Sequence, residues 1–219
     1  MLPRGGRVSA GSIRFDGEEL IGLDAGAYAR LRGRRIAYVP QEPMSNLDPA
    51  FKVGYQLIEP MRYVLGLSRK DARQRALDLL SQVGIADPKR TFDAYPHEIS
   101  GGMAQRVLIA GAISCDPDLL IADEPTTALD VTVQAEILDI LRRLQQERHM
   151  ALLLVTHNFG VVADLCDRVA VMQLGRIVEH GPTEQLFADP QNEYTRMLLD
   201  SILDGGPARP PSADPALRF

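Results

Sequence analysis

Short apolar runs alternate with helix-patterned stretches along this chain. The runs lie at residues 36–39, 119–122 and 150–155. Such runs predict strands, and the longest one, residues 150–155, should be fully buried. At residues 53–85 and 131–148 the apolar positions instead recur every three to four residues, which predicts helices. Strands that alternate with helices indicate an α/β fold with a mostly parallel sheet.

The two ends of the chain show other patterns. Residues 8–20 read as an antiparallel hairpin that turns at Asp16 and Gly17. Residues 168–172 and 176–179 predict two more strands, and residues 192–203 predict a last helix. We therefore expect one domain over residues 1–203. The remainder, residues 204–219, is rich in proline and alanine, which predicts a disordered tail.

Polar side chains follow the three apolar runs. Gln41 comes after the first run, Asp123 and Glu124 end the second, and His157 follows the third. Taken alone, Gln41 fits a loop residue in solvent and His157 a satisfied core residue. Because parallel strands place ligands at their carboxyl ends, the four together indicate a site. Two adjacent acids at a strand end suggest Mg²⁺ and general-base chemistry.

Two predicted helices begin with residues that suit a helix N-terminus. Ser100, Gly101 and Gly102 precede an amphipathic run, where a hydroxyl and bare backbone N–H groups attract anions. Asp130 precedes the helix predicted at residues 131–148. A role as N-cap would by itself explain why an acid stands there.

Composition narrows the class of protein. The 219 residues are 45% hydrophobic and 24% charged, which is typical of a soluble globular chain. The net charge of −5 argues against nucleic-acid binding. The longest apolar run is far shorter than the roughly 20 residues of a membrane span. The start lacks the apolar core of a secretion signal, so we expect a cytoplasmic protein. Two distant cysteines favour buried free thiols.

Several motifs together resemble the ATP-binding cassette (ABC) transporter family. Ser100-Gly101-Gly102 resembles its signature motif, and residues 119–124, LLIADE, resemble its Walker B strand. QEPMSNLDP, from Gln41, is similar to the Q-loop of the peptide-importer branch. Met103 replaces the usual glutamine of the signature, as it does in the branch that imports peptides and nickel. The resemblance covers nearly all of residues 1 to about 200.

The resemblance implies a fold and a set of roles. The fold would be a P-loop NTPase-like ABC ATPase core with a helical subdomain at about residues 44–115. Asp123 and Gln41 would help to hold Mg²⁺ beside ATP, and Glu124 would polarise the attacking water. His157 would contact the γ-phosphate and help to position the water.

The remaining roles concern a dimer of two such subunits. Ser100, Gly101 and Gly102 of one subunit would meet the γ-phosphate held by the other. Asp130, in the D-loop, would couple the two nucleotide sites.

One family motif is absent from the sequence. The P-loop, GxxxxGK[ST], cradles phosphates with backbone N–H groups and a lysine. The three lysines are Lys52, Lys70 and Lys89, and none of them follows a glycine. The start of the chain resembles family sequence just downstream of the P-loop helix. We therefore expect an N-terminal truncation, with the first strands and P-loop missing, and an inactive chain when it is alone.

These features predict the ATP-binding, ATP-hydrolysing subunit of an importer of di- or oligopeptides. Its partners would be a second ABC ATPase subunit, in a homo- or heterodimer, and integral membrane permease subunits. An extracytoplasmic substrate-binding protein would act indirectly, and the subunit would lie at the cytoplasmic side of the inner membrane.

Three alternatives stay open. One is an importer of nickel or glutathione. Another is a shortened, non-catalytic module that lends its signature motif to a complete ATPase. The third is a cassette ATPase of repair or translation, which the residues around Gln41 and Met103 and the lack of a long coiled-coil insertion disfavour.

Overall fold

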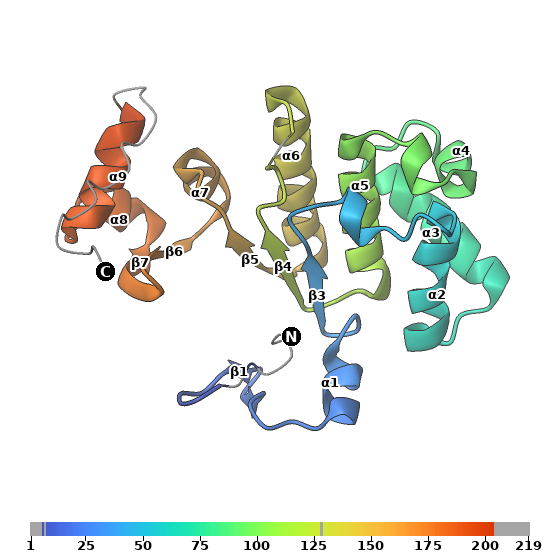
Figure 1. The fold of residues 1–219 in the computed structure, drawn as a ribbon, viewed down its shortest axis with the longest axis horizontal. Coiled ribbons are helices and arrows are strands. Elements are labelled where there is room, and N and C mark those ends of the chain that lie inside the picture. The colour runs from blue at the N-terminus through green and yellow to red at the C-terminus, as the bar shows by residue number, and fades with distance from the viewer. Residues whose placement is uncertain (1–5, 7, 128, 204–219) are drawn as a thin grey trace, which may run out of the picture.

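A three-stranded parallel sheet connects the two sides of the molecule in the computed structural model, which describes residues 6, 8–127 and 129–203. Its order is β3 (Ile36–Val39), β4 (Leu119–Asp123) and β5 (Ala151–Val155) (Figure 1). Val39 pairs with Ala122, and Ala122 pairs with Leu154, so the three strands end at the same edge. The predicted α/β fold with a parallel sheet is confirmed.

Helices cover the β3 side of the sheet (Figure 1). The helical pattern of residues 53–85 forms two helices because Gly66, at a φ of 68°, ends the first of them. A Cβ on Gly54 would lie 2.3 Å from the Phe92 ring, so this glycine lets two helices approach closely. The elements of this region are α2 (Val53–Leu65), α3 (Arg69–Gln82), α4 (Pro88–Asp93) and α5 (Gly101–Ala112), with 3₁₀ turns η1 (Met44–Asn46), η2 (Pro96–Glu98) and η3 (Ile113–Cys115).

Helix α6 (Val131–Arg148) carries the predicted apolar stripe into the core. Ile137, Leu141 and Leu144 are each exposed by 1% or less and belong to the same buried cluster as Leu120 of β4. Asp130 is the N-cap of this helix and accepts a hydrogen bond of 3.0 Å from the backbone N–H of Val133. The predicted helix and its cap are confirmed.

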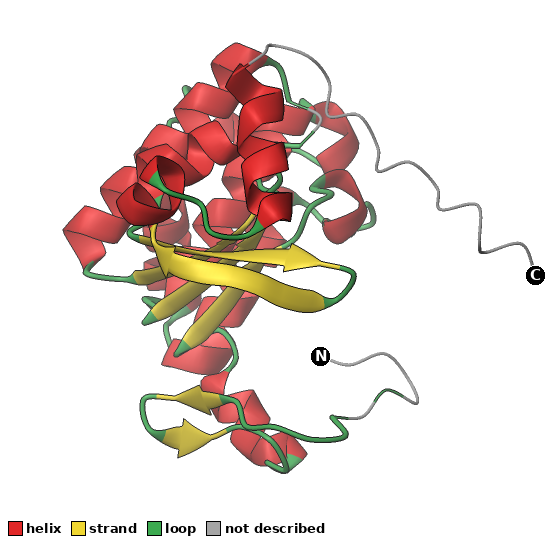
Figure 2. Cartoon of the chain, turned by 90° about the vertical axis from the view of Figure 1, so that its left-hand side faces the viewer, coloured by secondary structure: helices red, strands yellow, loops and turns green. Residues whose placement is uncertain are grey.

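The N-terminal hairpin stands apart from the main body (Figure 2). It consists of β1 (Arg14–Phe15) and β2 (Glu18–Glu19), which pair antiparallel around the predicted turn at Asp16, and helix α1 (Ala25–Leu31) follows. Arg35 donates one hydrogen bond of 3.0 Å to Asp16 and another to Asp118, next to β4. One guanidinium thus ties the hairpin to the start of the sheet.

The C-terminal elements comprise another two-stranded antiparallel sheet and three helices (Figure 1). Both predicted strands are present, although each is longer than expected. The elements are α7 (Phe159–Leu165), β6 (Arg168–Gln173), β7 (Arg176–Pro182), α8 (Thr183–Ala188) and α9 (Glu193–Leu203). The tail predicted at residues 204–219 lies outside the described residues. No helix within the described ranges has the length and apolar character needed to cross a membrane.

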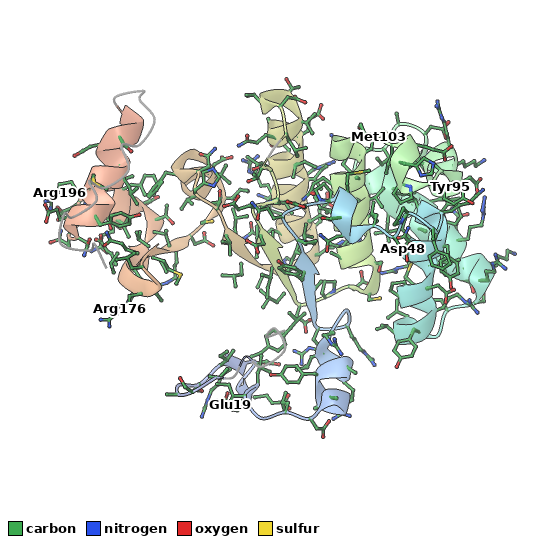
Figure 3. All side chains as sticks on the ribbon, in the orientation of Figure 1. Glu19, Asp48, Tyr95, Met103, Arg176 and Arg196 are labelled. Atoms are coloured by element: carbon green, nitrogen blue, oxygen red, sulfur yellow. The ribbon has the colours of Figure 1, made fainter. Side chains whose placement is uncertain are left out.

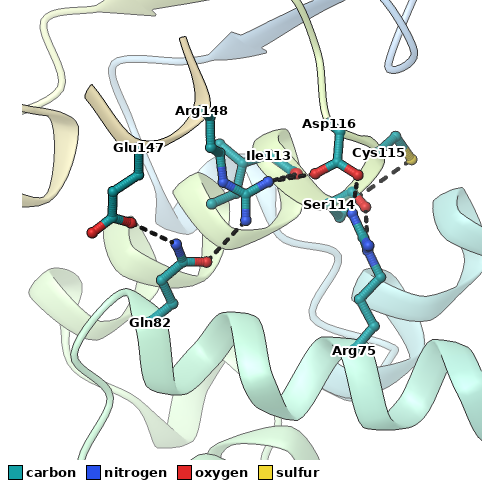
Figure 4. Close-up of polar contacts among 8 residues, drawn as sticks. All are labelled: Arg75, Gln82, Ile113, Ser114, Cys115, Asp116, Glu147 and Arg148. Carbon is teal, nitrogen blue, oxygen red and sulfur yellow. Dashed lines mark hydrogen bonds and ion pairs between the residues drawn. The ribbon is translucent and has the colours of Figure 1, made fainter. Parts of the chain in front are cut away.

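An ion-pair network holds the helices at the start of β4 (Figure 4). Asp116 accepts hydrogen bonds from Arg75 of α3 and Arg148 of α6. Arg148 also donates a hydrogen bond of 2.9 Å to the side chain of Gln82 in α3. Gln82 in turn donates a hydrogen bond of 3.4 Å to Glu147. Asp116 therefore links two helices that are distant in sequence to the chain that enters β4.

The prediction that residues 150–155 form a fully buried strand is wrong. The strand begins at Ala151, and none of its five residues is buried. Leu153 is 52% exposed and Val155 is 48% exposed. The exposed positions alternate along β5, and Leu153 is in register with Ile121 and with Tyr38, which is 54% exposed, so one face of the sheet is uncovered within the described ranges. Strand β5 is also an edge strand, because among the described strands it pairs only with β4. Exposed apolar side chains on an edge strand favour association with other chains.

Replacing these two side chains should lower self-association of the 219-residue chain. The double variant Leu153→Thr/Val155→Thr places residues with high strand propensity at both positions but removes about 1 kcal/mol of apolar contact per side chain. Sedimentation velocity over a concentration series should then give a several-fold weaker association constant. Val131→Thr is the control, because Val131 is 83% exposed at the start of α6. Equal weakening in the control would contradict the assignment to β5.

Candidate functional site

The carboxyl ends of the three parallel strands bring together residues that are far apart in sequence. Gln41 follows β3, Glu124 follows β4 and His157 follows β5. The Gln41 amide donates a hydrogen bond of 2.9 Å to Glu124 Oε2. His157 Nδ1 lies 3.1 Å from Glu124 Oε1. The Glu124 carboxylate is thus the centre of a cluster that draws on all three strand ends.

Glu124 itself is held firmly. Its backbone φ of 44° is unusual for a residue with a side chain and stores strain. Its backbone N–H donates a hydrogen bond of 2.8 Å to the Val155 carbonyl. The Thr127 hydroxyl donates a hydrogen bond of 2.7 Å to Glu124 Oε2. The hydrogen bonds from Thr127 and then His157 lower the pKa of the Glu124 carboxyl below its ordinary value. At neutral pH Glu124 is therefore an ionised carboxylate, which can accept a proton.

Asp123 has a different partner. Tyr38 of β3 lies opposite Ile121 of β4, so its side chain shares a sheet face with Asp123, two residues further on. The Tyr38 hydroxyl donates a hydrogen bond of 2.9 Å to Asp123 Oδ2. Burial and this hydrogen bond both raise the pKa of Tyr38. The phenol stays protonated and orients one oxygen of Asp123.

The sequence patterns did not identify Tyr38 and Thr127 as site residues. For each of them the spacing from a predicted site residue was an available indication. Tyr38 precedes Gln41 by three residues on a predicted strand, and Thr127 follows Glu124 by three residues in a turn. Neither spacing alone separates a site residue from an ordinary strand or turn residue.

The donor atoms suit a magnesium ion that shares its ligands with a substrate. Within the described part of the chain, the hydrogen bonds to Tyr38 and Glu124 use Asp123 Oδ2 and the Gln41 amide nitrogen, which leaves Asp123 Oδ1 and Gln41 Oε1 for a metal. Oxygen atoms are the ligands that Mg²⁺ prefers. Within the described ranges, no group of three or more His, Cys, Asp or Glu residues could hold a metal by itself. Mg²⁺ commonly takes one or two protein carboxylates and completes its shell with water and phosphate oxygens. The residues present fit that mode.

Ser100, Gly101 and Gly102 lie at the first turn of α5, apart from the Glu124 cluster. Ser100 is the N-cap of α5, and its hydroxyl oxygen accepts a hydrogen bond of 3.3 Å from the backbone N–H of Met103. A Cβ on Gly101 would meet no atom within 4 Å, whereas one on Gly102 would lie 2.9 Å from Val133 Cγ1. Gly102 is thus needed for packing against α6, while the surface at Gly101 is open. Gly102 also lies near the helix that Asp130 caps.

The two glycines should respond differently to alanine. Gly101→Ala gains helix propensity in open space and should raise the free energy of unfolding by about 0.5 kcal/mol. Gly102→Ala forces Val133 to move and should lower it by about 1–2 kcal/mol. Urea unfolding of both variants measures the difference. A destabilised Gly101→Ala or a stabilised Gly102→Ala would contradict this description of the two positions.

The model of the ABC transporter family matches residues 2–127 of this chain. Among curated proteins, a Brucella melitensis protein with the provisional name of peptide import ATP-binding protein is 50% identical over 202 residues, covering 90% of this chain and 60% of that protein. The dipeptide transport ATP-binding protein DppD of Haemophilus influenzae is 46% identical over 202 residues, covering 92% of this chain and 61% of DppD. The chain thus spans about 60% of the length of these relatives.

A solved structure also matches the fold. An ATP-binding cassette in a dimeric post-hydrolysis state, bound to ADP and Pi, superposes with a TM-score of 0.73 at 26% sequence identity. The match covers 81% of this chain and 75% of that cassette.

Proposed function

The chain belongs to the ABC transporter family, and we propose that it is the ATP-binding and ATP-hydrolysing subunit of an importer of di- or oligopeptides. The observation that carries the proposal is the convergence of Gln41 and His157 on Glu124 at adjacent strand ends. The identity with peptide-import relatives supports the substrate class.

In this proposal Glu124 accepts the proton of the attacking water. Its lowered pKa keeps the carboxylate ionised, and hydrogen bonds from Gln41 and Thr127 fix its orientation. His157 approaches Glu124 through Nδ1, which leaves Nε2 for the γ-phosphate of ATP. Asp123 and Gln41 would hold Mg²⁺, which supplies positive charge to the phosphate oxygens when it is bound.

The proposed partners follow from the second group of residues. Ser100, Gly101 and Gly102 would face the γ-phosphate of a second ABC ATPase subunit, and Asp130 would couple the two sites. The open surface at Gly101 supports this arrangement. The subunit would dock on integral membrane permeases at the cytoplasmic side of the membrane, with residues 44–115 as the helical subdomain. Nickel and glutathione remain alternative cargoes.

A second candidate function is a non-catalytic module that lends Ser100–Gly102 to a complete ATPase. The observation that favours it is that the 219 residues contain no GxxxxGK[ST]. Both candidates use the same signature surface, but only the first needs Glu124 as a base. Substitution of Glu124 therefore separates them.

Glu124→Gln in an assembled importer whose subunit carries a P-loop should lower ATP turnover by about 10² or more, because the amide keeps the shape but cannot take a proton. Nucleotide binding should be retained. Glu184→Gln, at an exposed position of α8, is the control. Unchanged ATP turnover in Glu124→Gln would contradict the role of Glu124 as general base and would favour the non-catalytic module.

The 219-residue chain alone should not bind Mg-ATP at micromolar concentrations. The cluster around Glu124 offers contacts to the metal and the γ-phosphate, but the sequence has no P-loop to cradle the triphosphate. Charge-assisted hydrogen bonds contribute about 1.5–3 kcal/mol each, so lacking three weakens binding by more than about 10³-fold. Isothermal titration calorimetry measures this. A stoichiometric micromolar site would show that the phosphates bind elsewhere.

A further inference from the structure

A polar cavity of about 490 Å³ lies beside α3 and is bordered by Arg148 at the end of α6. Ligand cavities commonly measure roughly 300–1,000 Å³, so this one has room for a small molecule. Helix α3 lies on the side of the molecule where Tyr95 is labelled in Figure 3, away from Arg176. We call this space the α3–α6 cavity and define it by six of its lining residues: Leu67, Asp71, Arg75, Asp78, Leu79 and Arg148.

The α3–α6 cavity is separate from the candidate site around Glu124. Arg75 and Arg148 of its lining both bond to Asp116 (Figure 4). Asp116 precedes β4, whereas Glu124 follows that strand. The cavity therefore lies toward the opposite end of β4 and has no part in the proposed hydrolysis.

Two guanidinium groups of the lining are held in place with part of their hydrogen-bonding capacity unused. Arg75 donates through Nε to the Ser114 carbonyl and through Nη2 to Asp116. The described hydrogen bonds of Arg148 use Nη1 and Nη2. Within the described residues this leaves Arg75 Nη1 and Arg148 Nε, and both oxygens of Asp116 are already used. Two fixed guanidiniums that share one carboxylate are able to bind another.

The acids of the lining are not neutralised by these arginines. Asp71 and Asp78 lie four and three residues from Arg75, close enough on a helix to pair with it. Arg75 instead reaches across to the start of β4, so neither acid forms an ion pair within the part of the chain that the structure describes. Asp71 lies in the first turn of α3 and accepts a hydrogen bond of 2.6 Å from the N-cap Ser68, which explains its presence. Asp78 lies farther along the helix and accepts a hydrogen bond of 2.9 Å from Gln74 through Oδ1, which leaves Oδ2.

We propose that the α3–α6 cavity binds a short peptide with a free amino terminus and a free carboxyl terminus. The carboxylate of the peptide accepts hydrogen bonds from Arg75 and Arg148, and its ammonium group donates to Asp78 Oδ2. Small side chains of the peptide pack on Leu67 and Leu79 of the lining. A ligand with one charge of each sign thus matches a lining that offers both signs.

The spacing of the charges favours a peptide over a single amino acid. Arg75 and Asp78 are three residues apart on α3, so their Cβ atoms are about 5–6 Å apart. The Arg75 side chain then continues to Ser114, in another segment of the chain. A single amino acid carries both charges on one Cα, whereas two extended residues span up to about 7 Å. The cavity therefore fits a dipeptide.

One consequence rests on the proposed function. In the subunit of a peptide importer, the α3–α6 cavity would bind cargo that has entered the cell, and the occupant would join α3 to α6. Binding involves neither ATP nor Glu124. A failure of the binding test would therefore leave the proposed ATPase function intact, and unchanged turnover in Glu124→Gln would leave the cavity intact.

An NMR titration of the 219-residue chain with Ala-Ala tests the proposal. The dipeptide should shift the amide signals of α3 and of the end of α6, with a Kd of about 1 mM or lower. N-acetyl-Ala-Ala lacks the ammonium group and Ala-Ala amide lacks the carboxylate, so each should bind at least roughly tenfold more weakly, as should free alanine. No saturable shift with Ala-Ala would overturn the proposal, as would equal binding of alanine or of either blocked peptide.

Substitutions of Asp78, an exposed residue, locate the ammonium group. Asp78→Asn should weaken binding of Ala-Ala at least roughly tenfold. Asp78→Lys should also reverse the preference, so that N-acetyl-Ala-Ala binds more tightly than Ala-Ala. Glu184→Gln, at an exposed position of α8, changes the net charge as Asp78→Asn does and should leave binding within about twofold. An equal loss in Glu184→Gln, unchanged binding in Asp78→Asn or an unreversed preference in Asp78→Lys would overturn the proposal.

Discussion

Parallel pairing of β3, β4 and β5 in a single register is the constraint on which the candidate site depends. Because Val39, Ala122 and Leu154 lie side by side, the residues that follow each strand meet at one edge. A slip of one residue in β4 would turn its side chains to the other face and separate Asp123 from Tyr38. The chemistry of Glu124 is therefore a property of strand register as much as of residue type.

Strand β4 is fixed at both of its ends. Before it begins, Asp116 joins Arg75 and Arg148, and Asp118 pairs with Arg35. After it ends, Glu124 accepts hydrogen bonds from groups on three segments. Single surface ion pairs contribute little, but several that share a carboxylate and a guanidinium form a network with better-defined geometry. Helices α3 and α6 thus help to hold the strand that carries both acids.

Local sequence patterns predicted most of the helices and strands. They did not predict properties that depend on how neighbouring elements pack. The helix after Asp130 and the strand before Asp123 could be predicted because propensity, caps and apolar spacing are local. The convergence of Gln41 and His157 followed from the rule that parallel strands end at one edge. The exposure of Leu153 could not be predicted, since apolar composition shows what a strand can bury and not whether another element covers that face of the sheet. Tyr38 and Thr127 required actual side-chain directions.

The left-handed backbone of Glu124 sets stability against function at this position. An unstrained residue there would be glycine or asparagine, which adopt positive φ at little cost. Either change would relax strain on the order of 1 kcal/mol and would remove the carboxylate. The hydrogen bonds of the carboxylate with Gln41, Thr127 and His157 offset part of this strain, so the position trades backbone freedom for an acid in a fixed orientation.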